Sequence, residues 1–329
     1  MLRPVSRLIP LAVAAVLSLT VSTAAADVRW RPKPPQPCIG ALPPGTPLSC
    51  LGTAPIPARS NTVAYEGLGT WLDAYDWAPE YGGTVKPSAL DEMQRRGIRT
   101  IYIQAAKQGT RSKGTLLSPS LLGQWLVGAH ARGIRVQAWY LPLFTDVAKD
   151  NASLDAIVAF RSQGHAFDTI GMDIEWRGVT DVKIRNSRLV AMSKRLRDKV
   201  PHLPLAAIVV APVVTNDVNK NFWNPFPWAE LKPLYDVWQP MGYWTDRKST
   251  SKWRDAHTST VWNVRYLRED LGDPKAKVHS IGGISPTGAE VRGFVNAANE
   301  ESSLGGSIYD YPHTAASVYK DLQKVPNQG

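Results

Sequence analysis

Short apolar segments alternate with amphipathic stretches from residue 66 almost to the C-terminus, and this alternation constrains the fold more than any other feature. The apolar segments have the length of β-strands, and the stretches between them have the start and stop signals of helices. Two of these helices run into Gly-Ile-Arg (97–99 and 133–135), as a C-terminal glycine leading into a parallel strand would. The eight candidate strands are Leu68–Tyr75, Thr100–Ala105, Arg135–Leu141, Phe167–Trp176, Leu205–Ala211, Val237–Trp244, Val278–Ile284 and Gly305–Tyr311.

Eight strands that alternate with helices over about 250 residues predict an α/β chain with a (β/α)8 TIM barrel, here residues 63–329. The other fold with this order is an open doubly wound sheet, which carries a G-x-G-x-x-G loop after its first strand. No such loop follows Leu68–Tyr75. In a barrel of this kind the active site lies at the C-terminal ends of the strands.

Two segments precede the predicted barrel. Residues 1–26 resemble a secretory signal peptide, with a positive start, a short apolar run and a small-x-small cleavage site; an uncleaved anchor is the alternative. Residues 27–62 contain too many prolines for a regular helix or strand, which predicts a Pro-rich arm. The only cysteines, Cys38 and Cys50, lie in this arm. An even number in an exported chain predicts one disulfide, with two free thiols or a metal site as alternatives.

The charge and the residue types narrow the range of partners. The formal net charge is +10, which suits anionic surroundings such as a bacterial envelope. No basic block or nucleic-acid motif appears, the six histidines lack metal-ligand spacing, and there is no G-x-S-x-G elbow. We therefore expect a secreted or envelope-associated monomer that binds no nucleic acid, stays off the membrane after signal cleavage and needs no metal or other cofactor.

The fourth candidate strand, Phe167–Trp176, carries a pair of acidic residues. Side chains alternate along a strand, so Asp173 and Glu175 share one face and their Cα atoms lie about 6.5–7 Å apart. Like charges at this separation raise the pKa of at least one carboxyl. A carboxylic acid that stays protonated near neutral pH is the proton donor that a glycosidic oxygen needs. Structural salt bridges to neighbouring arginines are the alternative.

Further carboxylates, amides and aromatic rings gather at the predicted ends of the other strands. Aromatic faces stack on the apolar faces of sugar rings, and amides and carboxylates bind hydroxyl groups. Any one of these rings is more simply explained as a cap on the barrel core, but the whole set at one rim predicts a carbohydrate-binding cleft. The set consists of Trp71, Asp73, Gln104, Trp139, Gln239, Tyr243, Trp244, Asp246 and Tyr309.

These residues resemble the motifs of secreted barrel glycoside hydrolases. In the family 18 chitinases and endo-N-acetylglucosaminidases the fourth strand carries D-x-x-D-x-D-x-E. Asp168, Asp173 and Glu175 match its first, third and last positions, and Gly171 stands at the second. Met241-Gly242-Tyr243 is similar to the Met-x-Tyr of that family's sixth strand. The resemblance implies that Glu175 is the acid, that Asp173 steers the substrate's N-acetyl group as it attacks the anomeric carbon, and that Tyr243 holds this acetamide.

The chain is also similar to the family 25 lysozymes. In that family an Asp on the first strand and an Asp-x-Glu on the fourth form the site, which here implies Asp73, Asp173 and Glu175. By this second resemblance Asp73 is a catalytic residue. Asp246 is a further candidate for a nucleophile or for water activation.

The leading hypothesis is an exported glycoside hydrolase that cleaves a β-linked, N-acetylated polysaccharide such as peptidoglycan or chitin, with Glu175 as the general acid. A non-catalytic carbohydrate-binding barrel is the first rival, because Gly171 departs from the family 18 motif and no second nucleophile is obvious. The second rival is a structural envelope protein that binds through its arm and its basic surface.

Overall fold

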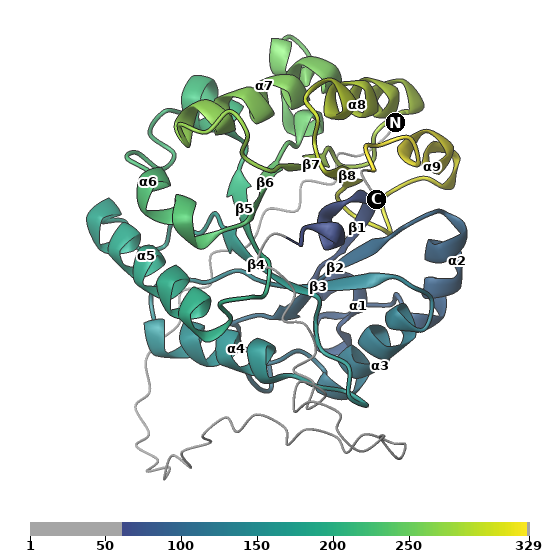
Figure 1. The fold of residues 1–329 in the computed structure, drawn as a ribbon, viewed down its shortest axis with the longest axis vertical. Coiled ribbons are helices and arrows are strands. Elements are labelled where there is room, and N and C mark those ends of the chain that lie inside the picture. The colour runs from purple at the N-terminus through teal and green to yellow at the C-terminus, as the bar shows by residue number, and fades with distance from the viewer. Residues whose placement is uncertain (1–60, 328–329) are drawn as a thin grey trace, which may run out of the picture. The chain divides into compact units, whose positions relative to one another are not determined.

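The computed structural model describes residues 61–327, which form a closed barrel of eight parallel strands (Figure 1). Each strand pairs with the next along the chain, and β1 closes the ring by pairing with β8, with Gly67 opposite Gly305. The predicted (β/α)8 barrel is confirmed. The strands are β1 (Gly67–Leu72), β2 (Thr100–Ala106), β3 (Arg135–Tyr140), β4 (Thr169–Ile174), β5 (Leu205–Val210), β6 (Val237–Met241), β7 (His279–Gly282) and β8 (Gly305–Ile308).

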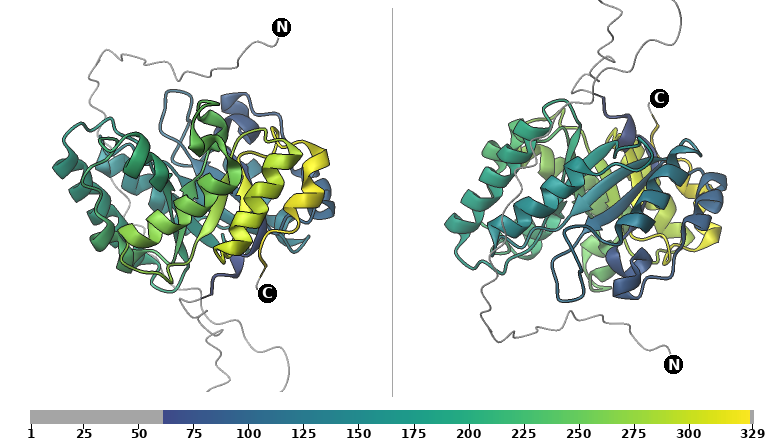
Figure 2. Two further views of the ribbon diagram at one scale, coloured as in Figure 1. Left: turned by 90° about the horizontal axis from the view of Figure 1, so that it is seen from above. Right: turned by 90° about the horizontal axis from the view of Figure 1, so that it is seen from below.

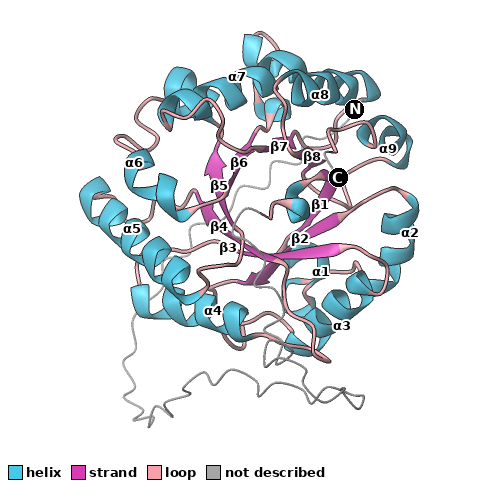
Figure 3. Cartoon of the chain, viewed as in Figure 1, coloured by secondary structure: helices cyan, strands magenta, loops and turns pink. Residues whose placement is uncertain are grey.

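Helices surround the strands, and Figures 2 and 3 show them on the outside of the barrel. Gly97 and Gly133 have positive φ angles of 75° and 69°, which confirms that the Gly-Ile-Arg junctions end two helices with a left-handed glycine. The helices are α1 (Ala74–Trp77), α2 (Leu90–Arg95), α3 (Pro119–His130), α4 (Val147–Ala159), α5 (Val182–Lys199), α6 (Trp228–Leu231), α7 (Ala256–Asp270), α8 (Gly288–Glu300) and α9 (Tyr319–Leu322).

Several strands end earlier than the sequence predicts. Strand β1 stops at Leu72 and not at Tyr75, because the Asp73 carboxylate accepts hydrogen bonds from the backbone N–H groups of Tyr75 and Asp76 and so begins α1. The strands β4, β6 and β8 also stop short, at Ile174, Met241 and Ile308. Several of the predicted site residues therefore lie on the loops that follow the strands; we call these strand ends and loops the rim.

The barrel interior is closed at the end opposite the rim. Tyr65 is fully buried there, and its hydroxyl is hydrogen-bonded to Thr169. His279 Nδ1 donates a hydrogen bond of 2.7 Å to the carbonyl oxygen of Tyr65. Above this layer, Gln137 Nε2 donates to Gln239 Oε1 at 2.9 Å. Because these side chains fill the lower barrel, a ligand reaches the interior from the rim.

Part of the predicted organisation lies outside the described residues. This applies to the signal peptide (1–26), to the proposed pairing of Cys38 with Cys50 and to nearly all of the Pro-rich arm (27–62). These features stay predictions. Among residues 61–327, no helix is both long and apolar enough to cross a membrane.

Candidate active site

The acid pair lies where β4 reaches the rim. Met172 and Ile174 are fully buried, and the sulfur of Met172 accepts hydrogen bonds from Ser193 of α5 and from Tyr235. Asp173 therefore points to the opposite side, into the barrel mouth, where only 6% of it is exposed. Glu175 follows the last residue of β4 and is exposed. The pair thus combines a buried carboxyl with one that solvent and ligands can reach.

The surroundings shift the pKa of both carboxyls upward. Burial raises the pKa of Asp173 well above its usual range, and the charge of Glu175 raises it further. Loss of water around the Glu175 carboxyl also raises its pKa, although the side chain stays open to solvent on one side. The ammonium group of Lys107, which follows β2, opposes both pKa shifts. Lys107 was not among the predicted site residues, although its position directly after a barrel strand is the signal that could have identified it.

Gln137 fills the space beside Gly171. A Cβ atom on Gly171 would lie 2.4 Å from Gln137 Nε2 and 3.0 Å from Ile208 Cδ1. The middle aspartate of the family 18 motif would therefore fit here only if the Gln137 side chain moved. Within the described chain, Asp173 Oδ1 is buried and has no hydrogen-bond partner. A ligand that carries an N–H or O–H group can satisfy this oxygen.

Asp168, the first residue of that motif, lies at the start of β4 and away from the rim. Its carboxylate accepts hydrogen bonds from His130 Nε2 at 2.9 Å and from the backbone N–H of Val136 at 2.7 Å. Asp168 thus joins the end of α3 to β3. Of the three acidic residues that match the motif, only Asp173 and Glu175 belong to the site.

Trp71 and Trp139 form an aromatic floor beneath the rim, together with Tyr102. The ring of Trp71 lies 4.6 Å from that of Tyr102 and 6.1 Å from that of Trp139, between centroids. Both indole N–H groups are used inside the protein, by Ser307 Oγ at 2.8 Å and by the Tyr102 carbonyl at 3.2 Å. Because both tryptophans are buried, they support the site from below and do not present open stacking faces.

Tyr243 and Tyr309 lie above this floor with their ring centroids 5.5 Å apart. Burial raises the pKa of Tyr243, and the charges of Glu175 and Asp173 raise it further. Tyr243 therefore interacts electrostatically with the acid pair, and its predicted contact with an acetamide stays a prediction. The Tyr309 hydroxyl donates a hydrogen bond of 2.8 Å to Asp73 Oδ2. Of the five aromatic residues predicted to contact sugar, only Tyr243 and Tyr309 are partly exposed; the three tryptophans are buried.

Asp73 and Gln104 hold the start of α1. The Asp73 carboxylate accepts two backbone hydrogen bonds and one from Tyr309, so both of its oxygens are engaged. Gln104 Oε1 accepts a hydrogen bond of 2.9 Å from the backbone N–H of Ala74. These contacts favour a supporting role for both residues over direct chemistry or binding of sugar hydroxyls.

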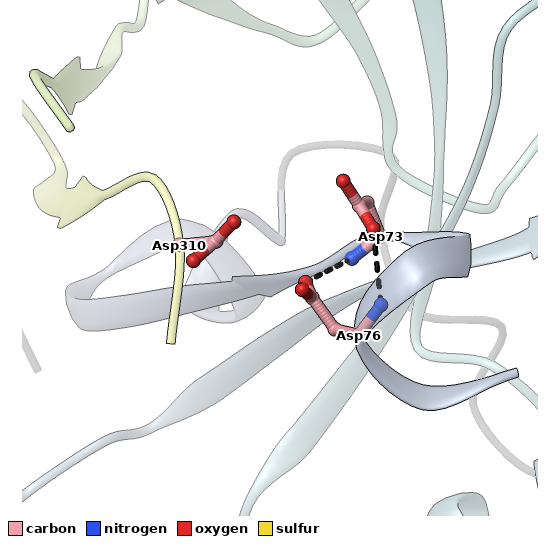
Figure 4. A group of neighbouring side chains, drawn as sticks. All are labelled: Asp73, Asp76 and Asp310. Atoms are coloured by element: carbon pink, nitrogen blue, oxygen red, sulfur yellow. Dashed lines mark hydrogen bonds between the residues drawn. The ribbon is translucent and has the colours of Figure 1, made fainter. Parts of the chain in front are cut away.

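Three acidic residues meet beside this helix start. Carboxylate oxygens of Asp73, Asp76 and Asp310 lie within 4.8 Å of one another (Figure 4). Asp76 Oδ2 accepts the backbone N–H of Asp73 at 2.8 Å, and Asp310 Oδ1 accepts hydrogen bonds from the backbone and the ring of His313. Burial raises the pKa of Asp310. Each carboxylate thus has a protein donor, and hydrogen bonding within the rim accounts for the cluster.

Two further predicted contacts, Trp244 and Gln239, lie away from the open rim, and a third, Asp246, is exposed on it. Trp244 is completely buried and packs on Phe294 of α8, with ring centroids 5.5 Å apart, so no sugar can reach it. Gln239 is also completely buried, inside the barrel and below the rim. Asp246 is exposed on the loop after β6, and its charge contributes to the raised pKa of Tyr243. The alternation rule explains Trp244, because a ring at a strand end faces either the barrel mouth or the helices.

Comparison with known proteins identifies relatives by structure alone. No protein-family model matches the sequence, and no curated protein matches it. Among solved structures, a class V chitinase from Pseudomonas fluorescens Pf-5 has a TM-score of 0.57 at 9% identity over 79% of this chain and 99% of its own. The PgaB (BpsB) glycoside hydrolase domain from Bordetella bronchiseptica has a TM-score of 0.56 at 11% identity, with 80% and 99% covered.

A family 18 N-acetylglucosaminidase from Paenibacillus barengoltzii has a TM-score of 0.53 at 10% identity and covers 79% of this chain and 99% of its own. At such low identity these likenesses show a shared fold. The chain therefore has the (β/α)8 barrel found in family 18 and related glycoside hydrolases.

Proposed function

We propose that this chain is an exported glycoside hydrolase that cleaves a β-linked, N-acetylated polysaccharide such as peptidoglycan or chitin. The observation that carries the proposal is the acid pair at the end of β4, where the pKa of both carboxyls is raised and Glu175 is open to a ligand. The barrel fold, which solved glycoside hydrolases share, supports it.

Glu175 acts as the general acid. A raised pKa increases the protonated fraction of this carboxyl at a given pH, and the protonated form can give its proton to the glycosidic oxygen as the bond from the anomeric carbon breaks. After cleavage the carboxylate takes a proton from the water that completes hydrolysis. Activity should therefore fall as the pH rises through the pKa of Glu175.

The nucleophile in this proposal is the acetamide oxygen of the substrate. Asp173 Oδ1 is buried and has no hydrogen-bond partner among residues 61–327, which suits it to accept the acetamide N–H. Tyr243 lies beside the pair and its hydroxyl can hold the acetamide oxygen. Asp73, the nucleophile or base that the family 25 resemblance implies, has both oxygens engaged. The hydrogen bonding of Asp73 thus favours the family 18 type of mechanism.

Release of reducing ends by the purified mature protein tests this function on chitin, peptidoglycan and neutral and acidic glycans. Glu175→Gln removes the proton donor and should lower turnover by about 10²–10⁴-fold. Glu230→Gln is the matched control, because Glu230 is an exposed carboxyl on α6, and it should retain full activity. Full turnover by Glu175→Gln on a verified substrate would show that Glu175 is not the acid.

A second candidate is a carbohydrate-binding barrel without turnover. The observation that favours it is Gln137, which fills the space of the family 18 middle aspartate. This candidate predicts saturable glycan binding by both the wild type and Glu175→Gln, with no reducing ends released at any pH.

A further inference from the structure

The loop after β2 carries two cations, Lys107 and Arg111, that no described carboxylate pairs with. Within residues 61–327, neither Lys107 nor Arg111 forms a salt bridge. Both instead lie over the same two rings: Lys107 Nζ is 5.3 Å from the centroid of Tyr75 and 5.8 Å from that of Tyr81, and the Arg111 guanidinium is 5.4 Å and 4.4 Å from them. Two like charges thus share one small aromatic surface.

The loop that carries these cations is held at both ends. Ser112 Oγ is hydrogen-bonded to the Tyr81 hydroxyl at 2.7 Å and donates to the Lys107 carbonyl. Gln108 Nε2 donates to Asp150 Oδ1 at 2.6 Å, which attaches the loop to α4. Gly109 passes so close to Tyr81 that a Cβ atom would lie 2.8 Å from its hydroxyl oxygen. The backbone that positions the cations is therefore fixed before a ligand arrives.

This surface is open and adjoins the proposed reaction centre. Tyr75 is 39% exposed and is one of three exposed large apolar side chains among the described residues. Lys107 lies over the Tyr75 ring, and its charge acts on Asp173 and Glu175. A sugar that stacks on Tyr75 would have any acidic substituent within reach of both cations.

We propose that Tyr75, Lys107 and Arg111 form a subsite for a carboxylate-bearing sugar of the glycan, next to the sugar on which Glu175 acts. The ring supplies an apolar face, and the ammonium and guanidinium groups supply charge-assisted hydrogen bonds to the carboxylate. This inference rests on the proposed function and narrows its substrate class to an anionic glycan. A lactyl ether on C3 and a uronic acid at C6 both provide the carboxylate.

Binding to the mature Glu175→Gln chain tests the subsite without turnover. The ligands are peptide-free glycan strands containing N-acetylmuramic acid, hyaluronan oligosaccharides and the carboxyl-reduced form of each. We expect one of the two native glycans to bind at least about tenfold more tightly than its carboxyl-reduced form, because reduction removes the charged hydrogen bonds. Added salt should weaken this preference. The glycan that shows the preference identifies whether the carboxylate belongs to a lactyl ether or to a uronic acid.

Added substitutions assign the preference to its residues. Lys107→Gln and Arg111→Gln should each reduce this preference several-fold, and should weaken binding of the native form more than binding of the reduced form. Lys113→Gln is the matched control, an exposed cation on the same loop, and should keep the preference. The subsite would be overturned if native and reduced forms bound equally or if neither bound. It would also be overturned if the preference survived both substitutions. Absence of reducing-end release by the wild type would overturn the proposed function and leave this binding preference intact.

Discussion

Replacing Asp173 with asparagine tests how much the buried carboxyl of the acid pair lowers the free energy of unfolding. Asp173 is buried, and burial together with the charge of Glu175 raises its pKa well above the usual range. In the unfolded chain the same carboxyl titrates near its ordinary pKa of about 3.9. Asparagine has nearly the same shape and does not titrate. The difference in free energy of unfolding between variant and wild type therefore reports on the ionisation of Asp173 together with its coupling to Glu175.

The direction in which stability changes with pH follows from whether the folded or the unfolded chain keeps the proton of Asp173. Below about pH 4 the carboxyl is protonated in both states and its ionisation costs nothing. Between that pH and the raised pKa of the folded state, the unfolded chain loses the proton and the folded chain keeps it. The wild type then loses stability as the pH rises, by at most about 1.4 kcal/mol per pH unit. Asp173→Asn should gain relative to the wild type over this window, and the gain should level off above the pKa of the folded state.

Urea denaturation at a series of values from about pH 4 to about pH 8 measures this difference. The new amide adds a constant offset, since no described residue hydrogen-bonds to Asp173 Oδ1. The slope against pH therefore carries the result, and the absolute stability does not. Asp246→Asn, an exposed carboxyl on the same rim, is the control and should change stability by less than about 0.5 kcal/mol. A difference for Asp173→Asn that stays flat across this range, or falls with pH, would refute the reasoning.

Four other substitutions, one of them a control, test the roles of single side chains. Trp244→Ala should cost about 3–5 kcal/mol in urea unfolding, because the ring is fully buried, and should leave turnover per folded molecule unchanged; a raised KM without loss of stability would contradict this. Tyr309→Phe removes a hydrogen bond of 2.8 Å and should cost about 1 kcal/mol. Asp236→Asn breaks a largely buried ion pair with Arg197 and should cost about 3 kcal/mol, whereas Asp198→Asn, in an exposed pair, should cost less than about 1 kcal/mol.

The fold was predictable because its signal is repeated along the chain. Each unit has a strand-length apolar segment and a helix, and left-handed glycines such as Gly97 and Gly133 end helices where the pattern places them. Eight repetitions allow few closed arrangements, so errors at single strand ends do not change the result. The ends themselves were predicted less well. At β1, the Asp73 carboxylate caps α1 and so ends the strand. The pattern of apolar residues gives no sign of such a side-chain cap.

The acid pair was predictable from the alternation of side chains, but the roles of its neighbours were not. Sequence order places Trp71, Trp139 and Trp244 near strand ends, and it does not say which faces the barrel mouth. Two of them form the buried floor, and the third packs on α8. Gln104 and Asp73 look like ligands in the sequence, but in the structure backbone donors occupy them. Whether a polar side chain is free depends on distant partners, which a linear pattern does not reveal.

Lys107 shows how one side chain links the two proposals. As a cation near the acid pair it lowers the pKa of both carboxyls, so on its own it weakens Glu175 as a proton donor at neutral pH. A carboxylate bound at Lys107 would offset that effect, because the added negative charge raises the pKa of a neighbouring acid. An anionic substrate would thus bind at Lys107 and also strengthen the acid that cleaves it. Under this reasoning, the alkaline limb of the pH profile should lie at a higher pH for a carboxylate-bearing glycan than for its carboxyl-reduced form, and Lys107→Gln should remove the difference.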